Sequence, residues 1–262
     1  MIEIFNITLF GINFIFSVIL LAFICELINA LLGGGHGTIV TPLLILLGFA
    51  PLSIIPSVLL AEIISGFLVS IAHHKFGNVD FRISSAHLKV ALVLGICSVI
   101  GVILAVIVAV NVSTFILEAY IGLLVLSIGV VILATLNMKF CFSWGKILGL
   151  GIFAAFNKGI SGGGYGPIIT AGQILTGLNS KEAVSISSLA KSLACIVGII
   201  AYFVLSKNVN WFLAPSLVLG AVFSVPFSAF IVKKMYERSL RIFIGLLTIS
   251  LGAATLIKIF LT

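Results

Sequence analysis

The stretches that decide the fold are NALLGGGHGTIVTP (29–42) and NKGISGGGYGPIIT (157–170), which share a run of three glycines. Each run ends a long apolar segment and begins a short one of 12 residues, 37–48 or 166–177. Twelve residues of helix span about 18 Å, whereas the hydrocarbon core of a bilayer is roughly 30 Å thick. We therefore predict that each short segment is a half-helix that begins inside a membrane.

The composition also indicates a membrane protein. Of the 262 residues, 61% are hydrophobic and only 8% are charged, and the mean hydropathy is +1.39. A water-soluble surface of this size requires far more charge. The net charge of +7 comes from 14 basic and 7 acidic residues scattered along the chain, which excludes the dense basic face of a nucleic-acid-binding protein.

The four cysteines carry no signature of a metal site or a disulfide framework. Cys25, Cys97, Cys141 and Cys195 lie far apart, in or beside apolar runs, so we interpret them as small buried hydrophobic residues. The chain has no Walker A motif, so direct use of ATP is not supported. We predict that the protein requires neither a metal nor a cofactor.

Eight further apolar segments are long enough to span a bilayer as helices. They are 8–32, 52–73, 84–110, 113–135, 145–161, 182–205, 211–232 and 238–261. We predict an all-α polytopic membrane protein. Each half should contain four long helices and one short half-helix that follows its glycine break.

The two halves of the chain are internal repeats. An offset of 129 residues places Gly33–Gly35 on Gly162–Gly164, and a later offset of 123 places IGLLVLSIG (121–129) on IGLLTISLG (244–252). Recurrence of several motifs in the same order indicates a duplication. The predicted transmembrane repeats, within one integral membrane domain, are residues 1–135 and 136–262.

The basic residues of the loops favour an inverted arrangement of the repeats. If each half crosses the membrane five times, its short helix included, one side keeps little beyond Lys207 and Lys258. The other side collects Lys75, Arg82, Lys139, Lys146, Lys181, Lys233, Lys234, Arg238 and Arg241. This distribution follows the positive-inside rule, and it fails if each half crosses four times. We predict two inverted repeats with both termini outside, an architecture of secondary transporters.

The glycine breaks are the predicted binding site for an anion. Glycine allows close approach of a ligand, and a helix that begins inside the membrane has unpaired N–H groups and a positive dipole end. Two such ends would converge near the midplane. The candidate substrate-binding residues are Asn29, Gly34, Gly35, His36, Gly37, Asn157, Lys158, Ser161, Gly163, Gly164 and Tyr165. The alternative is that the glycines only allow close helix packing.

Glu26, Glu62, Lys158 and Lys191 are the ionisable residues deepest in the predicted spans. Each costs about 2.5 to 3.5 kcal/mol there, so each should face a partner or a cavity. Lys158, four residues before the second glycine run, is the predicted counter-charge of the anion. Glu62 and Lys191 occupy equivalent positions, and two interpretations stay open: a structural ion pair, or a coupling role in which Glu62 carries a proton. Glu26 faces either a lumen or a neighbouring helix.

His36 and its equivalent Tyr165 lie inside the glycine motifs. Both can donate a hydrogen bond to an oxyanion, and His36 can also take up a proton near neutral pH. The alternative for His36 is a bond to the local backbone. The sequence leaves both interpretations open.

The motifs GGGHGTIVTPLLILLG and GGGYGPIITAGQILTG, in a chain of two related apolar halves, resemble those of the sulfite exporter TauE/SafE family of membrane permeases. The resemblance covers nearly the whole chain. The second copy departs from the pattern at Ala171, where the first has Pro42. The resemblance implies export of sulfite, sulfoacetate or a related organosulfonate or organic anion across the prokaryotic plasma membrane. The residues themselves favour an anion but do not identify sulfur.

Three classes of function are compatible with these features. The first is a secondary transporter whose partners are a small anionic substrate, the lipid bilayer and a coupling proton or other ion. The second is a passive anion channel, although the opposite charges of Glu62 and Lys191 do not suggest its ring of like charge. The third is an intramembrane serine hydrolase with Ser161 as nucleophile and a histidine or Lys158 as base. Leu32 replaces Ser161 in the first repeat, so we predict that the protein is not an enzyme.

Overall fold

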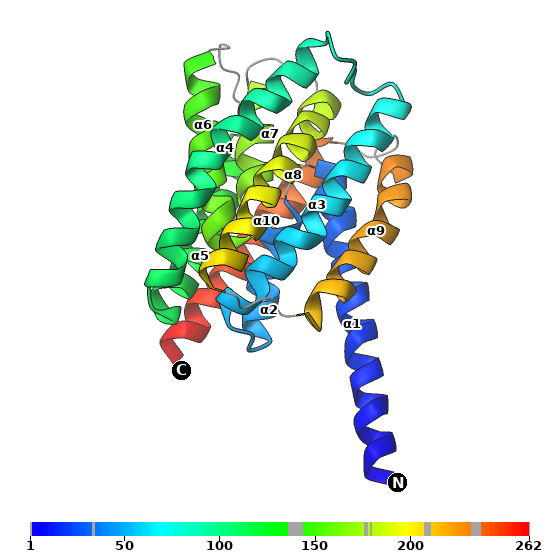
Figure 1. Cartoon of the computed structure of the whole chain (residues 1–262), viewed down its shortest axis with the longest axis vertical. Helices are drawn as coiled ribbons and strands as arrows, with labels where there is room; N and C mark the ends of the chain where they lie inside the picture. The colour runs from blue at the N-terminus through cyan, green and yellow to red at the C-terminus, as the bar shows by residue number, and fades with distance from the viewer. Residues whose placement is uncertain are drawn as a thin grey trace.

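The computed structural model of the chain describes residues 2–32, 35–135, 144–175, 178, 180–206, 211–231 and 237–261, and ten helices lie within them. These helices are α1 (Ile2–Leu32), α2 (His36–Leu46), α3 (Pro51–Lys75), α4 (Ala86–Asn111), α5 (Thr114–Ala134), α6 (Trp144–Ser161), α7 (Tyr165–Leu175), α8 (Ser180–Leu205), α9 (Leu213–Ile231) and α10 (Glu237–Leu261). Figure 1 shows that they form one bundle, from which the first turns of α1 project.

Each predicted apolar segment corresponds to one of these helices. The two short segments form α2 and α7, which have 11 residues each. Among the described residues, helices α3, α4, α5 and α8 are long and apolar enough to cross a membrane, and α1, α2, α9 and α10 contain shorter apolar stretches. The prediction of an all-α polytopic membrane protein is confirmed.

Local sequence explains where several helices begin. Ser85 and Ser113 cap α4 and α5, because each hydroxyl accepts a hydrogen bond from the backbone N–H three residues later. Pro51 occupies the first turn of α3, where its missing N–H has no helical partner to lose. Helix α2 follows Gly35, which has a φ of 81° and provides no side-chain cap. In the first turn of α2, the N–H of Thr38 donates to the carbonyl oxygen of Gly35 and the N–H of Gly37 donates to a side chain of α3.

The helix pairs that pack together have a regular pattern. Helix α1 packs along α9 as α6 packs along α4, and α3 packs along α9 as α8 packs along α4. Helices α3 and α8 also pack together, as do α5 and α10. If each helix is exchanged with the one five places away in the chain, so that α1 becomes α6 and α4 becomes α9, the same set of packed pairs results. Two related halves produce such a pattern, and their inverted orientation stays a prediction.

Glycines allow equivalent close crossings in the two halves. In α4, a Cβ atom at Gly101 would lie 2.4 Å from the carbonyl oxygen of Ile152 in α6. In α9, a Cβ atom at Gly220 would lie 2.3 Å from the carbonyl oxygen of Ile19 in α1. In both crossings the alanine three residues after the isoleucine is the next contact. Small residues therefore bring the backbones together in the same way twice.

The α5–α10 pair depends on glycines from both helices. Gly122 and Gly129 in α5 are the equivalents of Gly245 and Gly252 in α10. A Cβ atom at Gly252 would lie 2.5 Å from the backbone nitrogen of Leu126, and one at Gly129 would lie 2.7 Å from the carbonyl oxygen of Gly245. These neighbouring atoms belong to the backbone, so they cannot rotate away from a larger side chain.

The two short helices are held differently at their far ends. Near the end of α10, the Nζ atom of Lys258 donates a hydrogen bond to the carbonyl oxygen of Ile45 in α2. Thr135, the equivalent of Lys258 by the later offset, donates to the carbonyl oxygen of Val131 at the end of its own helix. A cavity of about 370 Å³ lies beside α7, between α5 and α6, and its lining is almost entirely apolar.

The two ends of the bundle carry different loops. Figure 1 shows both chain termini at one end and the α3–α4 connection at the other. Near that connection, Asp80, Arg82 and Glu182 line one surface hollow, which places the start of α8 beside it. The predicted loop cations Lys139, Lys207, Lys233 and Lys234 lie outside the described residues.

The crossing of α5 and α10 gives a test of the packing. Gly252→Ala should lower the apparent melting temperature, because its Cβ atom would overlap the backbone of α5 and overpacking costs about 1–3 kcal/mol. Gly149→Ala in α6 is the matched control, since nothing lies within 4 Å of its Cβ position and alanine favours a helix by about 0.5–1 kcal/mol. Thermal unfolding in detergent measures both. Equal melting temperatures for Gly252→Ala and the wild type would contradict the crossing.

Candidate functional site

The first turn of α2 and the loop that follows α6 are in direct backbone contact. A Cβ atom at Gly37 would lie 1.7 Å from the carbonyl oxygen of Gly162, and one at Gly163 would lie 2.7 Å from the backbone nitrogen of Thr38. Gly162 and Gly164 have φ angles of 69° and 80°, in a region that other residues rarely adopt. Glycine is therefore required here by both space and conformation, and it brings the two predicted repeats together.

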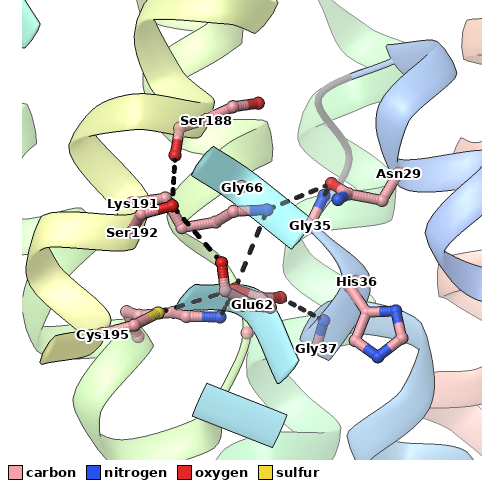
Figure 2. A network of polar contacts seen from close by, with 12 residues as sticks. Asn29, Gly35, His36, Gly37, Glu62, Gly66, Ser188, Lys191, Ser192 and Cys195 are labelled. Atoms are coloured by element: carbon pink, nitrogen blue, oxygen red, sulfur yellow. Dashed lines mark hydrogen bonds and ion pairs between the residues drawn. The ribbon is translucent and has the colours of Figure 1, made fainter. Parts of the chain in front are cut away.

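The carboxylate of Glu62 in α3 lies at the start of α2 (Figure 2). Its Oε1 atom accepts a hydrogen bond of 2.7 Å from the backbone N–H of Gly37, and its Oε2 atom accepts one from Nζ of Lys158 in α6. The same Nζ atom donates to the carbonyl oxygen of Gly162 at 2.6 Å. A side chain of the protein thus occupies the place at the N-terminus of α2 that favours an anion.

Lys191 in α8 brings a second ammonium group to this carboxylate, as Figure 2 shows. Its Nζ atom lies 3.8 Å from Oε2 of Glu62 and 3.5 Å from Oδ1 of Asn29, to which it donates. The Sγ atom of Cys195, one turn later in α8, also lies 3.8 Å from Oε2. The repeat in the sequence pairs Glu62 with Lys191 alone, whereas the structure brings Lys158 into the same cluster.

The ionisable groups of this region are shielded from solvent. Glu26, Glu62 and Lys158 are 0% exposed, and Lys191 is 2% exposed. Moving an ion out of water costs several kcal/mol unless partners compensate it. Two carboxylates and two ammonium groups balance one another here when His36 is neutral. Both acids come from the first half of the chain, and both lysines come from the second.

Glu26 and His36 form a further polar contact where α1 meets α2. The Nδ1 atom of His36 lies 3.2 Å from Oε2 of Glu26, and both side chains are 0% exposed. The amide of Asn29 donates to Oε1 of Glu26 at 2.9 Å and accepts from the N–H of Gly35 at 2.7 Å. Glu26 therefore faces a neighbouring helix, and Asn29 connects it to Lys191.

The second glycine loop is held by side chains on both of its sides. The Oγ atom of Ser161 accepts from the N–H of Gly163 at 3.0 Å and donates to the carbonyl oxygen of Asn157 at 2.7 Å. The N–H of Gly164 donates to Oγ1 of Thr38 in α2 at 2.9 Å. Several N–H groups predicted to bind the substrate thus have partners within the protein in this conformation.

Two predicted site residues lie outside the Glu62 cluster. The amide oxygen of Asn157 accepts a hydrogen bond from the hydroxyl of Tyr120 in α5. The hydroxyl of Tyr165 accepts one from Oγ of Ser98 in α4 at 3.2 Å. Both Asn157 and Tyr165 are fully buried. Gly34 falls outside the described residues.

Four polar side chains of this region were not predicted from the sequence as site residues. They are Thr38, Tyr120, Ser192 and Cys195. Ser192 and Cys195 could have been found from the sequence, because they lie one and four residues after Lys191 in the same helix. No sequence signal connects Tyr120 with Asn157, because α5 and α6 approach one another only in the fold.

The hydrolase alternative has no support in this arrangement. The Nζ atom of Lys158 is bound to the carboxylate of Glu62 and to a backbone carbonyl oxygen. The hydroxyl of Ser161 is bound to the backbone of its own loop. These hydrogen bonds hold Lys158 and Ser161 to other partners and not to each other.

Comparison with known proteins identifies the family of the chain. The profile of the family described as Sulfite exporter TauE/SafE matches residues 18–255, which include both glycine loops and the Glu62 cluster. The Probable membrane transporter protein YtnM of Bacillus subtilis (strain 168) is 28% identical over 250 residues, covering 89% of this chain and 79% of that protein. No solved structure matches the chain significantly. The chain therefore belongs to the sulfite exporter TauE/SafE family, and it is a membrane transporter and not an enzyme.

Proposed function

We propose that this protein exports sulfite, or a related small organosulfonate or organic anion, across the plasma membrane by alternating access. The observation that carries the proposal is the convergence of Lys158 and Lys191 on one carboxylate at the start of α2. The family description supplies sulfite as the first substrate to test. Anions with similar oxygens are the next candidates.

In this proposal the carboxylate of Glu62 is an internal substitute for the substrate. It is an oxyanion held by the N–H of Gly37 and by Lys158, with the ammonium group of Lys191 at 3.8 Å. Sulfite and sulfonates also present negatively charged oxygens. Charge-assisted hydrogen bonds to such oxygens are roughly twice as strong as neutral ones. A substrate anion would bind by taking these donors from Glu62.

Such an exchange keeps both lysines paired throughout a transport cycle. Unpaired, each buried ammonium group would cost several kcal/mol. Glu62 offsets this cost when no substrate is bound, and the substrate offsets it after Glu62 has moved aside. The empty binding site can then turn back to the other side of the membrane without leaving an unpaired charge in the low-dielectric interior.

The halves formed by residues 1–135 and 136–262 move against each other in this mechanism. Helices α2 and α7 begin where the two glycine loops touch, so a rocking motion would change the side from which the cluster is reached. The acid and lysine side chains are at most 2% exposed. Such burial supports an occluded conformation over a passive channel, whose pore needs a continuous path.

We place both termini outside the cell and the α3–α4 connection in the cytoplasm. Lys75, Arg82 and Lys181 belong to loops or helix ends of the cytoplasmic side, in agreement with the positive-inside rule. Exposed apolar side chains such as Ile96, Ile100 and Phe203 would then contact the lipid tails.

Transport against a gradient tests the proposed carrier. Liposomes that contain the protein should accumulate labelled sulfite above its external concentration when an ion gradient is imposed, because a carrier couples the two fluxes. Protein-free liposomes are the control. Equilibration of sulfite without accumulation, under every imposed gradient, would favour the passive channel instead.

Lys158→Ala should weaken anion binding roughly ten- to hundredfold, since a charge-assisted hydrogen bond contributes about 1.5–3 kcal/mol. Lys89→Ala removes an exposed lysine from α4 and is the matched control. Titration of sulfite against the purified variants, followed by thermal shift, gives the affinities. Similar affinities for Lys158→Ala and Lys89→Ala would exclude Lys158 from the site.

Glu62→Gln should tighten anion binding by about tenfold or more, because a neutral amide competes less well for Lys158 and Lys191. Turnover should fall, because the variant lacks the internal anion that replaces the leaving substrate. Asp80→Asn, at an exposed position in the α3–α4 connection, is the control. Unchanged or weaker affinity in Glu62→Gln would show that Glu62 does not compete with the substrate.

A further inference from the structure

We infer that Glu26 and His36 form the proton-binding site of this protein, and that one proton enters with each monovalent anion. The inference rests on the proposed function, because it names the coupling ion of the same anion site. Four observations support it: the unsatisfied atoms of the pair, the saturation of Glu62, the charge balance of the cluster and the connection through Asn29.

The Glu26–His36 pair has free capacity for a proton. Both side chains are 0% exposed, and Nδ1 of His36 lies 3.2 Å from Oε2 of Glu26. Apart from this contact, neither ring nitrogen of His36 nor Oε2 of Glu26 has a hydrogen-bond partner among the described residues. A neutral imidazole carries one N–H and one lone pair. A proton from water can add to that lone pair, and the resulting imidazolium is balanced by the carboxylate beside it.

Glu62 has no such capacity. Its Oε1 atom is occupied by the N–H of Gly37, and its Oε2 atom is occupied by Lys158, with Lys191 at 3.8 Å. A proton on either oxygen would replace a charge-assisted hydrogen bond with a weaker contact. In this conformation the buried group that can accept a proton without losing a partner is therefore the Glu26–His36 pair, whereas Glu62 would become free to accept one only after an anion had taken its donors.

The charge balance of the cluster sets the number of protons. Glu26, Glu62, Lys158 and Lys191 sum to zero when His36 is neutral, and all of them are buried. A monovalent anion brings this sum to −1, and a net buried charge is unfavourable. Protonation of His36 restores zero. The cluster therefore favours the joint entry of one anion and one proton.

Asn29 connects the proton site to the anion site. Its Nδ2 atom donates to Oε1 of Glu26 at 2.9 Å, and its Oδ1 atom accepts from Nζ of Lys191 at 3.5 Å. Figure 2 shows Asn29 and Lys191 joined beside Glu62, with the ring of His36 apart from the bonds around that carboxylate. Protonation of the pair thus changes the surroundings of Lys191 through a single side chain.

The helices that pack against α1 and α2 carry further titratable groups. Helices α2, α9 and α10 pack against α1, while α3, α5, α6 and α10 also pack against α2. These helices, with α1 itself, carry Glu3, Cys25, Glu62, His73, His74, Lys75, Glu118, Tyr120, Lys146, Lys158, Glu237, Arg238, Arg241 and Lys258, and α9 carries none. Glu62 and Lys158 bind each other, and Lys258 binds Ile45. His36 contacts Glu26, and Lys191 of α8 donates a hydrogen bond to Asn29, which joins it to the pair.

The second half of the chain does not repeat this proton site. Its residues equivalent to Glu26 and His36 are Ala155 and Tyr165, and the hydroxyl of Tyr165 is bound to Ser98. Because Ala155 cannot titrate, the duplicated fold provides one proton site and not two. One site agrees with the single proton that the charge balance requires.

Proton uptake during anion binding tests the inference. The purified full-length protein is titrated with methanesulfonate, whose single charge stays constant with pH, in two buffers of different ionisation enthalpy between about pH 5.5 and 8.5. The difference in binding heat between the buffers gives the number of protons taken up. Sulfite is titrated in parallel to test anion binding itself. We expect close to one proton per methanesulfonate in the wild type near the upper end of this range.

Two variants should shift the affinity in opposite directions. His36→Gln cannot take up the proton, so it should keep the weak, high-pH affinity of the wild type at every pH. Glu26→Gln removes one negative charge, so it should keep the tight, low-pH affinity at every pH. Both should lose proton uptake, whereas His87→Gln, at the start of α4, should retain it. Local unfolding would weaken both variants together and would not produce opposite shifts.

Each outcome has a defined meaning. Anion binding without proton uptake in the wild type would overturn the inference and leave the proposed function standing. Full proton uptake in His36→Gln and Glu26→Gln would also overturn it, and loss of uptake in Glu62→Gln alone would move the proton to Glu62. Failure of the wild type to bind either methanesulfonate or sulfite would instead remove the proposed function and, with it, this inference.

Discussion

The need to keep buried charge paired is the constraint on which the rest of this structure depends. Lys158 and Lys191 are both removed from solvent, and one carboxylate, that of Glu62, serves them. This contact depends on glycines, which allow the first turn of α2 to touch the loop after α6 through the backbone. The buried charges are therefore paired because the glycine motifs and the half-length helices bring the charged side chains together.

A nearly symmetric scaffold here carries asymmetric chemistry. Equivalent crossings in the two halves use the same small residues, yet Glu62 is the counterpart of Lys191 and Asn29 is the counterpart of Lys158. If the repeats were chemically identical, acids would face acids and lysines would face lysines, which is unfavourable in a low dielectric. The two halves thus carry complementary charge where they meet, although their equivalent crossings pack in the same way.

The sequence was sufficient for the helices because apolar length and glycine breaks are local properties. The sequence was not sufficient to predict which charged side chains contact one another in the cluster. The repeat offset paired Glu62 with Lys191, but Lys158 occupies a non-equivalent position and reaches Glu62 only through the contact of the loops. The same motif was compatible with a bound anion or with close packing. Only the fold shows that, in this conformation, the N–H of Gly37 is already bound to Glu62.

The bond between Lys258 and Ile45 makes the two short helices mechanically unequal. Helix α2 is anchored near its start by Glu62 and near its end by Lys258, whereas α7 lies beside an apolar cavity, and Thr135 bonds only to its own helix there. In the proposed transport cycle the two short helices would therefore not move alike, and the energy barriers on the two membrane faces would differ.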